Sequence, residues 1–300
     1  IKKFNGEDVT ECDYISKDLY KKVSNEFGVP KENDLLITTR GTIGIPYLYK
    51  RTDRFYFADG NLTWIKDFDS NLYSKFLYYW FQSYEGRKKF EALAKGTAQK
   101  AVPISGIKTL EIELPSLKSQ KRIADILSAY DDLIENNQKQ IKLLEEAAQR
   151  LYKEWFVDLR FPGHENTKIV DGVPEGWHWG LLQELINVNY GKDHKKAPES
   201  GDVSVYGSGG LIRKCNKSLF SGEAVLIPRK GSLNNIMYVD ETFWTVDTMF
   251  YATMKQPHTA IFVYFFVKSF DMYSMNIGAA VPSMTTKILD AMNVLIPKDE

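Results

Sequence analysis

The sequence is poor in cysteine and in long apolar runs, and both shortages narrow the class of protein. Only two cysteines, Cys12 and Cys215, occur in 300 residues. Their wide separation favours reduced thiols over a disulfide scaffold. The longest apolar run, near Ile261–Val267, is shorter than the roughly 20 residues of a membrane-spanning helix. We therefore expect a cytoplasmic protein without a membrane segment.

The sequence also lacks an excess of one charge and the motifs of most enzymes. It carries 39 basic and 39 acidic residues, so any contact with nucleic acid must come from a local face or be shared with a partner. The four histidines have no metal-ligand spacing. There is no nucleotide-binding glycine loop, no serine-nucleophile motif and no Asn/Asp-Pro-Pro-aromatic tetrad. We predict no catalytic residue, no metal site and no cofactor bound by this chain.

What the sequence does contain is a long heptad pattern from Gln120 to Trp155. Apolar residues recur at alternating steps of four and three, and neither glycine nor proline interrupts them. This pattern indicates a long helix with one apolar seam, which at 1.5 Å per residue would span roughly 50 Å. The seam residues are Ile123, Leu127, Tyr130, Ile134, Asn137, Ile141, Leu144, Ala148, Leu151 and Trp155.

Two interpretations of this seam stay open. An ordinary long core helix is one, and a coiled coil is the other and the one we favour, since a narrow seam on so long a helix requires a partner helix. Asn137 within the apolar seam fits a residue that sets the pairing register. Ser116 or Ser119 is predicted to cap the start of the helix.

The segment before the helix has the pattern of a mixed α/β domain. Between its strands, Leu72–Ala94 carries aromatic residues at helical spacing, although Gly86 weakens the helix midway. We expect these aromatic residues in the core rather than on a stacking surface. Short strands are expected at Asp34–Thr38, Ile45–Lys50, Phe55–Phe57, Leu62–Ile65 and Leu110–Leu114.

The segment after the helix repeats this plan. Glu223–Pro228 is a predicted strand like Asp34–Thr38, and Ala260–Met275 is a predicted aromatic-rich helix. After the strand, Arg229–Ser232 takes the place of Arg40–Thr42.

Two further segments of the second half match the first. Ile277–Ser283 and Lys95–Ile104 both combine glycine, small residues and Val-Pro, and Val294–Pro297 matches Ile112–Pro115. The offset of about 180–190 residues is too long for a solenoid and indicates a duplicated domain.

We therefore predict an α+β chain of two similar mixed α/β domains, joined by a long coiled-coil-forming helix. The first domain is placed at 1–115, the helix at 116–160, a linker at 161–171 and the second domain at 172–300. The symmetry of the repeat predicts another long helix after Pro297. We expect that helix, and the N-terminal part of the first domain, to be absent from this chain.

Several stretches resemble type I restriction–modification specificity subunits over essentially the whole chain. The resemblance is most specific in the central region and weaker in each recognition-domain motif. The stretches are Leu114–Leu117, Gln120–Leu127, Leu151–Asp158, Gly172–Trp177, Tyr206–Gly210, Ile227–Ser232 and Phe243–Thr248.

The resemblance implies a DNA-reading subunit without catalysis of its own. In that family two target recognition domains each read one half of a split DNA target. Two long helices pair antiparallel, fix the distance between the domains and dock two methyltransferase subunits, and restriction subunits join the complex. S-adenosylmethionine, ATP and Mg would then be bound in the partner subunits. Since this chain has one such helix, its seam would pair with another copy or with a helix that is absent here.

The candidate DNA contacts lie in loops. Arginine can bridge guanine and glutamine can read adenine, while glycine lets backbone approach a phosphate and clustered lysines neutralise phosphates. A solvated turn or a packing loop is the alternative at each position. The candidates are Arg40, Gly41, Thr42, Thr97, Gln99, Lys100, Lys192, His194, Lys195, Lys196, Tyr206, Ser208, Gly209, Arg229, Lys230, Gly231 and Ser232.

Two other functional classes remain possible from the sequence. A coiled-coil adaptor whose flanking domains bind protein would show the same heptad helix without reading DNA. A specificity region of a larger methyltransferase–nuclease fusion would carry enzyme motifs elsewhere in its reading frame. Asp193-His194-Lys195 fits a fragment of a nuclease site, but no acidic partner accompanies it, and a metal nuclease is not favoured.

Overall fold

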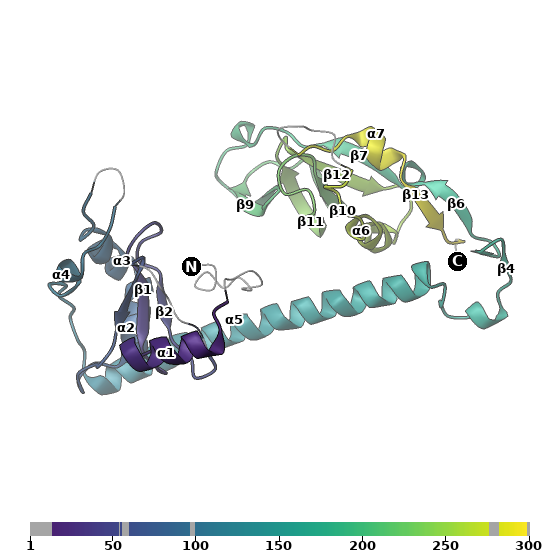
Figure 1. Ribbon diagram of the computed structural model, residues 1–300. Helices are drawn as coiled ribbons and strands as arrows, with labels where there is room; N and C mark the ends of the chain where they lie inside the picture. Colours follow the sequence, from purple (N-terminus) through teal and green to yellow (C-terminus); the bar gives the residue numbers. More distant parts are fainter. Residues whose placement is uncertain (1–13, 54, 56–59, 97–99, 276–281, 299–300) are drawn as a thin grey trace. The chain divides into compact units, whose positions relative to one another are not determined.

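The computed structural model describes residues 14–53, 55, 60–96, 100–275 and 282–298. The chain divides into two compact units, residues 1–140 and 141–300. The helix α5 (Leu117–Tyr152) is continuous across this division (Figure 1). Within the described residues, no helix is both long enough and apolar enough to cross a membrane.

The first unit is a small three-stranded antiparallel sheet with helices packed against it. The strand order is β2-β1-β3, with Leu36 opposite both Tyr47 and Trp64. All four residues of the central strand are buried, because both faces and both edges of that strand are covered. The elements before α5 are α1 (Lys17–Phe27), β1 (Leu35–Thr38), β2 (Pro46–Leu48), β3 (Leu62–Ile65), α2 (Ser74–Gln82), α3 (Tyr84–Glu91) and α4 (Ile104–Ile107).

The aromatic segment 72–94 is helical, as predicted, but it breaks into α2 and α3. Ser83 is the N-cap of α3, and its hydroxyl accepts a hydrogen bond from the Gly86 N–H at 3.0 Å. A Cβ on Gly86 would lie 1.9 Å from the Trp80 carbonyl oxygen. The glycine therefore permits the tight passage from one helix to the next. Phe81 and Phe90 pack edge to face in the core, with centroids 5.3 Å apart.

Two strand predictions in this unit had other outcomes. The prediction of a strand at Leu110–Leu114 is wrong, because this segment has no regular secondary structure. A strand needs a neighbour for its backbone groups, and no described segment of the first unit pairs with it. Of the strand expected at Phe55–Phe57, residues 56 and 57 lie outside the described residues.

The long helix begins one turn earlier than the heptad pattern. Ser116 caps it, because the Ser119 N–H donates to the Ser116 hydroxyl at 3.2 Å. The helix ends in a π-helical turn, Lys153–Val157, which contains Trp155. Its buried residues are Gln120, Ala124 and Ser128, which lie at spacings of four on one face.

The predicted apolar seam of α5 is a different face, and it is largely exposed to solvent. Its large apolar side chains range from 39% exposed at Ile123 to 70% at Leu144, and Asn137 is exposed as well. Only Ala148 and Trp155 among the seam residues are half-buried. The helix therefore presents an uncovered apolar stripe, the pattern expected of a coiled-coil strand.

The second unit is built on a six-stranded sheet. Its strand order is β7-β12-β10-β11-β8-β9, and all neighbours are antiparallel except β11 and β8. The strands and helices are β4 (Ile169–Val170), β5 (Val173–Pro174), β6 (His178–Leu181), β7 (Ile186–Tyr190), β8 (Val203–Gly207), β9 (Gly210–Cys215), β10 (Phe220–Pro228), β11 (Met237–Thr245), β12 (Met249–Met254), α6 (Ala260–Lys268), α7 (Thr286–Asp290) and β13 (Asn293–Ile296). Short 3-10 turns occupy His164–Asn166, Leu182–Glu184 and His194–Lys196.

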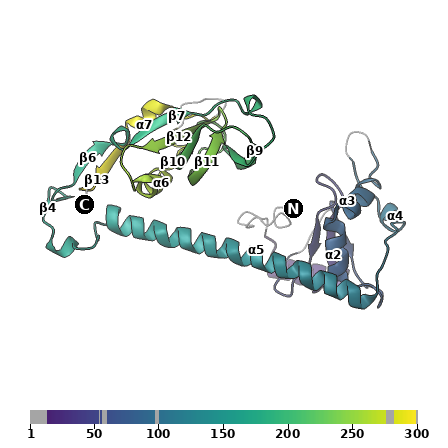
Figure 2. The same ribbon diagram turned by 180° about the vertical axis from the view of Figure 1, so that it is seen from behind.

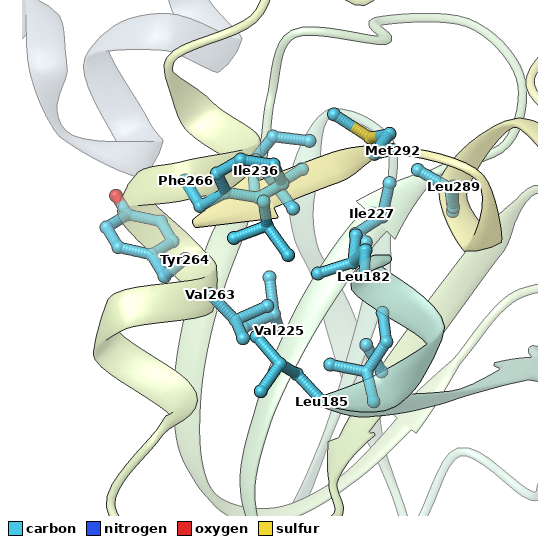
Figure 3. Packing of buried hydrophobic residues seen from close by; sticks show 14 of the residues in the cluster. Leu182, Leu185, Val225, Ile227, Ile236, Val263, Tyr264, Phe266, Leu289 and Met292 are labelled. Atoms are coloured by element: carbon cyan, nitrogen blue, oxygen red, sulfur yellow. The ribbon is translucent and has the colours of Figure 1, made fainter. Parts of the chain in front are cut away.

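The central strand β10 separates two hydrophobic clusters. Val225 and Ile227 point to the cluster beneath α6, whereas Ala224 and Leu226 point to the cluster on the other face. Figure 3 shows Val225 and Ile227 among the packed residues of the first cluster, and both ribbon views place α6 along β10 (Figures 1 and 2). Burial of both faces explains the uninterrupted apolar run at this strand.

The predicted helix Ala260–Met275 is shorter in the structure. It ends at Lys268, and the hydroxyl of the next residue, Ser269, donates to the Phe266 carbonyl at 2.7 Å. Asp271 then organises a turn by accepting from the Tyr273 N–H at 3.2 Å. The segment matched to Ile112–Pro115 contains most of the strand β13, which pairs with β6.

The structure corrects the register of the repeat. Arg40 forms an isolated bridge with Ala101, and Lys230 forms the equivalent bridge with Ser283. Ala101 therefore corresponds to Ser283. The two Val-Pro pairs that suggested the match are not equivalent, since Val102-Pro103 follows the bridge in the first unit whereas Pro282 precedes it in the second.

Candidate nucleic-acid interface

In the second unit, one turn joins three loops that carry candidate residues. Thr245 and Thr248 supply carbonyl oxygens to the backbone N–H groups of neighbouring loops, and Val246 donates to the Tyr206 carbonyl at 2.9 Å. The Thr245 carbonyl accepts from Lys192 N at 2.9 Å, and the Thr248 carbonyl accepts from Lys230 N at 3.2 Å. These bonds place the loops after β7, β8 and β10 around a single scaffold.

The basic loop Lys192–Ala197 is fixed at both ends. The Trp244 indole N–H donates to the Lys192 carbonyl at 2.9 Å. At the far end, Arg213 donates from Nη2 to the carbonyls of His194, at 2.5 Å, and Ala197, at 2.8 Å. Between these anchors Asp193 accepts from the Lys195 N–H at 3.0 Å. The side chains of Lys192 and Lys195 are exposed, so the loop presents charge on a constrained backbone.

The tip of the β8–β9 hairpin contacts the loop after β10. Gly207 pairs with Gly210, which leaves Ser208 and Gly209 as the two-residue turn. The Ser208 carbonyl accepts from the Asn235 amide at 2.9 Å. A Cβ added to Gly231 would lie 2.8 Å from the Ser208 hydroxyl oxygen, so these predicted residues are brought together.

Tyr206 sits beside an acidic group. Its hydroxyl donates to Glu241 Oε1 at 2.5 Å. Burial, and then the Glu241 carboxylate, raise the pKa of Tyr206 to about 12. The phenol is thus neutral near pH 7, and in this structure its proton is engaged by a carboxylate.

Arg229 and Lys230 have different roles despite being neighbours. The Arg229 guanidinium lies over the Tyr190 ring, 5.4 Å from its centroid, and its Nη1 donates to the Asp247 carbonyl at 3.2 Å. Lys230 is exposed and follows directly in the chain. Arg229 therefore holds the loop, and Lys230 occupies the position that matches Arg40.

The loop after Lys230 is anchored below its exposed residues. Leu233 is fully buried in the core. The Asn234 amide donates to Asp271 at 3.0 Å, and the Tyr273 hydroxyl donates to the Gly231 carbonyl at 3.1 Å. Gly231 and Ser232 remain exposed on a loop that is fastened at its base.

The first unit contains a matching loop. Arg40 and Thr42 are exposed, and Gly41 has a φ of 69°. Its counterpart Gly231 has a φ of 85°, a conformation that favours glycine. The bridge from Arg40 to Ala101 brings Lys100 next to this loop. Of the other candidates in this unit, Thr97 and Gln99 lie outside the described residues, as does the side chain of Lys196 in the second unit.

Sequence reasoning missed the residues that organise the second loop cluster. They are Tyr190, Arg213, Trp244, Thr245, Thr248, Asn235 and Tyr273. Their bonds use mainly backbone groups, which leave little trace in a sequence. The stretch Phe243–Thr248 resembles a family motif, but its sequence does not indicate that it holds the neighbouring loops together. Among the described residues, no group of three or more His, Cys, Asp or Glu side chains could hold a metal ion.

A family comparison identifies the class of these two units. A family described as the type I restriction modification DNA specificity domain matches residues 1–146 and again residues 174–300. The chain belongs to this family, and its two halves are two copies of a DNA specificity domain. The α+β fold with a long helix between two such regions is confirmed.

Individual relatives agree with the family. A 124-residue segment is 34% identical to the type I restriction enzyme MjaIX specificity subunit of Methanocaldococcus jannaschii and covers 40% of this chain and 29% of that protein. A 218-residue segment is 29% identical to the putative type I specificity subunit S.MgeORF438P of Mycoplasma genitalium and covers 69% of this chain and 54% of that protein. The matches thus span about a third to about half of these relatives' length.

A solved structure is similar in fold. The crystal structure of the type I restriction-modification system S subunit from M. genitalium superposes with a TM-score of 0.57 at 22% identity, covering 89% of this chain and 72% of that one. This likeness shows the shared fold.

Proposed function

We propose that the chain is the DNA-reading specificity subunit of a type I restriction–modification complex and recognises a split target with its two units. The observation that carries this proposal is the repeated loop. Arg40-Gly41 and Lys230-Gly231 follow equivalent strands, and Arg40 and Lys230 each form an equivalent backbone bridge within their own unit. Two equivalent basic loops suit two half-sites, since each can place a cationic side chain at a base edge or a phosphate.

In this proposal α5 separates the two units and docks the methyltransferase subunits. The helix contains 36 residues and would be about 54 Å long at 1.5 Å per residue, on the order of one and a half turns of B-DNA. Its exposed apolar stripe supports helix pairing, with another copy or with a second helix. The balanced charge of the chain fits a complex in which partners supply further phosphate contacts.

The chemistry of the complex would belong to other subunits. Methylation would use S-adenosylmethionine in the methyltransferase subunits, and cleavage would use ATP and Mg in the restriction subunits. This chain would contribute target choice and geometry. Its relatives are named as specificity subunits, which supports that division of labour.

The test is a methylation map of DNA from a host that produces the chain together with its methyltransferase subunits. We expect one split adenine-methylated motif with a fixed gap, present only when the chain is produced. Arg40→Ala should weaken recognition of one half-site and Lys230→Ala that of the other. Lys22→Ala in α1 and Lys217→Ala in the β9–β10 connection remove exposed lysines outside the candidate loops and serve as matched controls.

A map without a chain-dependent motif, together with no preference of the purified complex for any DNA, would overturn the proposal and favour a protein-binding adaptor. If both loop variants methylate the same motif at the same rate as the controls, the two loops are not the reading elements.

A further inference from the structure

Gln120 is an unusual residue in the first turns of α5. Its side chain is fully buried, whereas most of the helix faces solvent. Polar side chains of this size are seldom fully buried unless their hydrogen bonds are made. Its position on the docked face of the helix therefore calls for partners on the first unit.

Those partners are backbone groups on two sides of the side chain. Gln120 Oε1 accepts from the Tyr73 N–H at 2.9 Å. Its Nε2 donates to the Asn71 carbonyl at 2.8 Å and to the Pro115 carbonyl at 2.9 Å. Both amide protons and the amide oxygen are used, so the three bonds define the orientation of the side chain in three directions.

One of these bonds also completes a helix end. Tyr73 is the N-cap of α2, and its own side chain makes no capping hydrogen bond. The Gln120 oxygen satisfies the Tyr73 N–H from another element, in the way that a capping-box glutamate or glutamine does within one helix. The start of α5 is thereby joined to the start of α2.

The other residues on the face of α5 that packs against the first unit are small or make polar contacts at the edge of that face. Ala124 is fully buried and Ser128 is 9% exposed, so the helix approaches the unit closely. Farther along, the Tyr79 hydroxyl donates to Asp131 at 2.7 Å, and Glu135 lies 3.6 Å from the Lys50 ammonium. Small-residue packing has little directional preference, and exposed ion pairs contribute little.

We propose that Gln120 is a positioning residue that fixes the register of α5 on the first unit and thereby sets the gap between the two DNA half-sites. The inference rests on the proposed function. A buried, fully bonded polar group selects one alignment among packings of similar apolar contact, because a shifted alignment would leave its partners unpaired. Without the hydrogen bonds of Gln120, α5 can rotate or slide on the contacts of Ala124 and Ser128. The first unit would then shift relative to α5.

The test compares gap selectivity in the assembled methyltransferase complex. Gln120→Met keeps the length of the side chain but removes both donors and the amide acceptor, and Gln138→Met makes the same change at an exposed position of α5. The substrates are duplexes with the two half-sites of the mapped motif and gaps up to two base pairs shorter or longer. We expect the wild type and Gln138→Met to methylate one gap. In Gln120→Met we expect the ratio of the preferred gap to its neighbours to fall about tenfold, with both half-site sequences still required.

Unchanged gap selectivity in a folded Gln120→Met complex would overturn the inference. Gln120→Glu gives a second reading, since it retains an acceptor for the Tyr73 N–H but loses both donors, and it should also relax the gap. If neither variant assembles, Gln120 serves folding rather than register, and the inference fails. A wild type that shows no split motif would instead refute the proposed function, so the two failures are distinguishable.

Discussion

Lys230 and Ser283 pair through an isolated antiparallel bridge, and Arg40 and Ala101 do the same in the other unit. In both cases the basic residue stands between a buried strand and a glycine with positive φ. The bridge ties the base of the loop to the segment before a short helix. The basic side chain therefore projects from a backbone held on both sides, which suits a contact that must be made at one place on DNA.

The glycine after Lys230 is predicted to be essential for this loop. Gly231→Ala places a Cβ in the left-handed region, which costs about 1–2 kcal/mol, and that Cβ would lie 2.8 Å from the Ser208 hydroxyl. We expect the free energy of unfolding of the second unit to fall by at least this strain, measured by urea denaturation.

Two variants control for this effect. Gly41→Ala has the positive φ but no atom within 4 Å of the new Cβ, so we expect the strain alone. Gly209→Ala also meets nothing within 4 Å, and its φ is not in the left-handed region, so we expect a change of about 0.5 kcal/mol or less. Equal stability of the three variants would contradict this account of the loop.

Arg213 is predicted to matter for DNA binding although it need not touch DNA. Arg213→Gln removes the guanidinium nitrogen that donates to the carbonyls of His194 and Ala197, and the loop bearing Lys192 and Lys195 should then lose its fixed shape. We expect weaker DNA binding by the complex and a smaller salt dependence. One phosphate contact contributes about 0.9 to the magnitude of the slope of log K against log salt concentration. In Arg213→Gln that magnitude should decrease by more than the contribution of one contact.

Lys214→Gln is the matched control for this prediction. It removes one exposed positive charge from the adjacent residue and leaves the loop anchored. The magnitude of its slope of log K against log salt concentration should decrease by about 0.9 or less, the contribution of one phosphate contact. If the two variants have the same slope, Arg213 acts only through its charge.

The local sequence pattern predicted the secondary structure correctly wherever the same pattern also determined the packing. Leu35–Ile37 and Ala224–Pro228 are short apolar runs, and both lie in central strands with buried faces. The heptad helix was equally clear, because its period repeats over many turns. Leu110–Leu114 has similar composition to β13, yet only β13 has a partner strand. A strand depends on a neighbour that local sequence does not reveal.

The candidate site could be predicted only in part, for a related reason. Arg229 was the natural match for Arg40 by residue type, but the backbone bridge makes Lys230 its equivalent. Arg229 instead packs on Tyr190, a residue far away in the sequence. The repeated Val-Pro likewise suggested a register that hydrogen bonding does not follow. Which side chain faces outward depends on these distant contacts.

Tyr206 is predicted to make the second unit less stable at alkaline pH. Its pKa is raised from 10.0 to about 12, by burial first and then by Glu241. Between these values the unfolded chain binds fewer protons than the folded chain at this group. The contribution of Tyr206 to the free energy of unfolding should therefore be constant below about pH 10 and fall as the pH rises toward 12.

An absorbance titration of the tyrosines, together with unfolding at each pH, checks this prediction. Glu241→Gln removes the carboxylate but not the burial, so we expect the pKa of Tyr206 to fall and yet remain above 10. Tyr238, whose pKa is raised to about 12 chiefly by its hydrogen bond to Glu223, provides an internal comparison that Glu241→Gln should not affect. A Tyr206 that titrates near 10 in the wild type would contradict the prediction.

Phe156 is predicted to fasten the end of the long helix to the second unit. It lies in the π-helical turn after α5, and its ring contacts Phe262 at 4.8 Å and Trp177 at 5.9 Å between centroids. Tyr152, one turn earlier, lies 6.0 Å from Phe265. Aromatic pairs of this kind contribute about 0.5–1.5 kcal/mol each beyond their burial.

Phe156→Ala should therefore lower the free energy of unfolding of the second unit by about 2 kcal/mol or more. It removes the ring contacts with Phe262 and Trp177, the further ring contacts within the helix end, and the buried area of a half-buried phenylalanine. Val157→Ala, at a neighbouring residue that is 59% exposed, should change it by about 0.5 kcal/mol or less. Hydrogen exchange distinguishes a local from a global effect. If Phe156 fastens the helix end, exchange should rise first in the last turns of α5, whereas a uniform rise across β10 and β12 would place the role of the ring in the core of the unit instead.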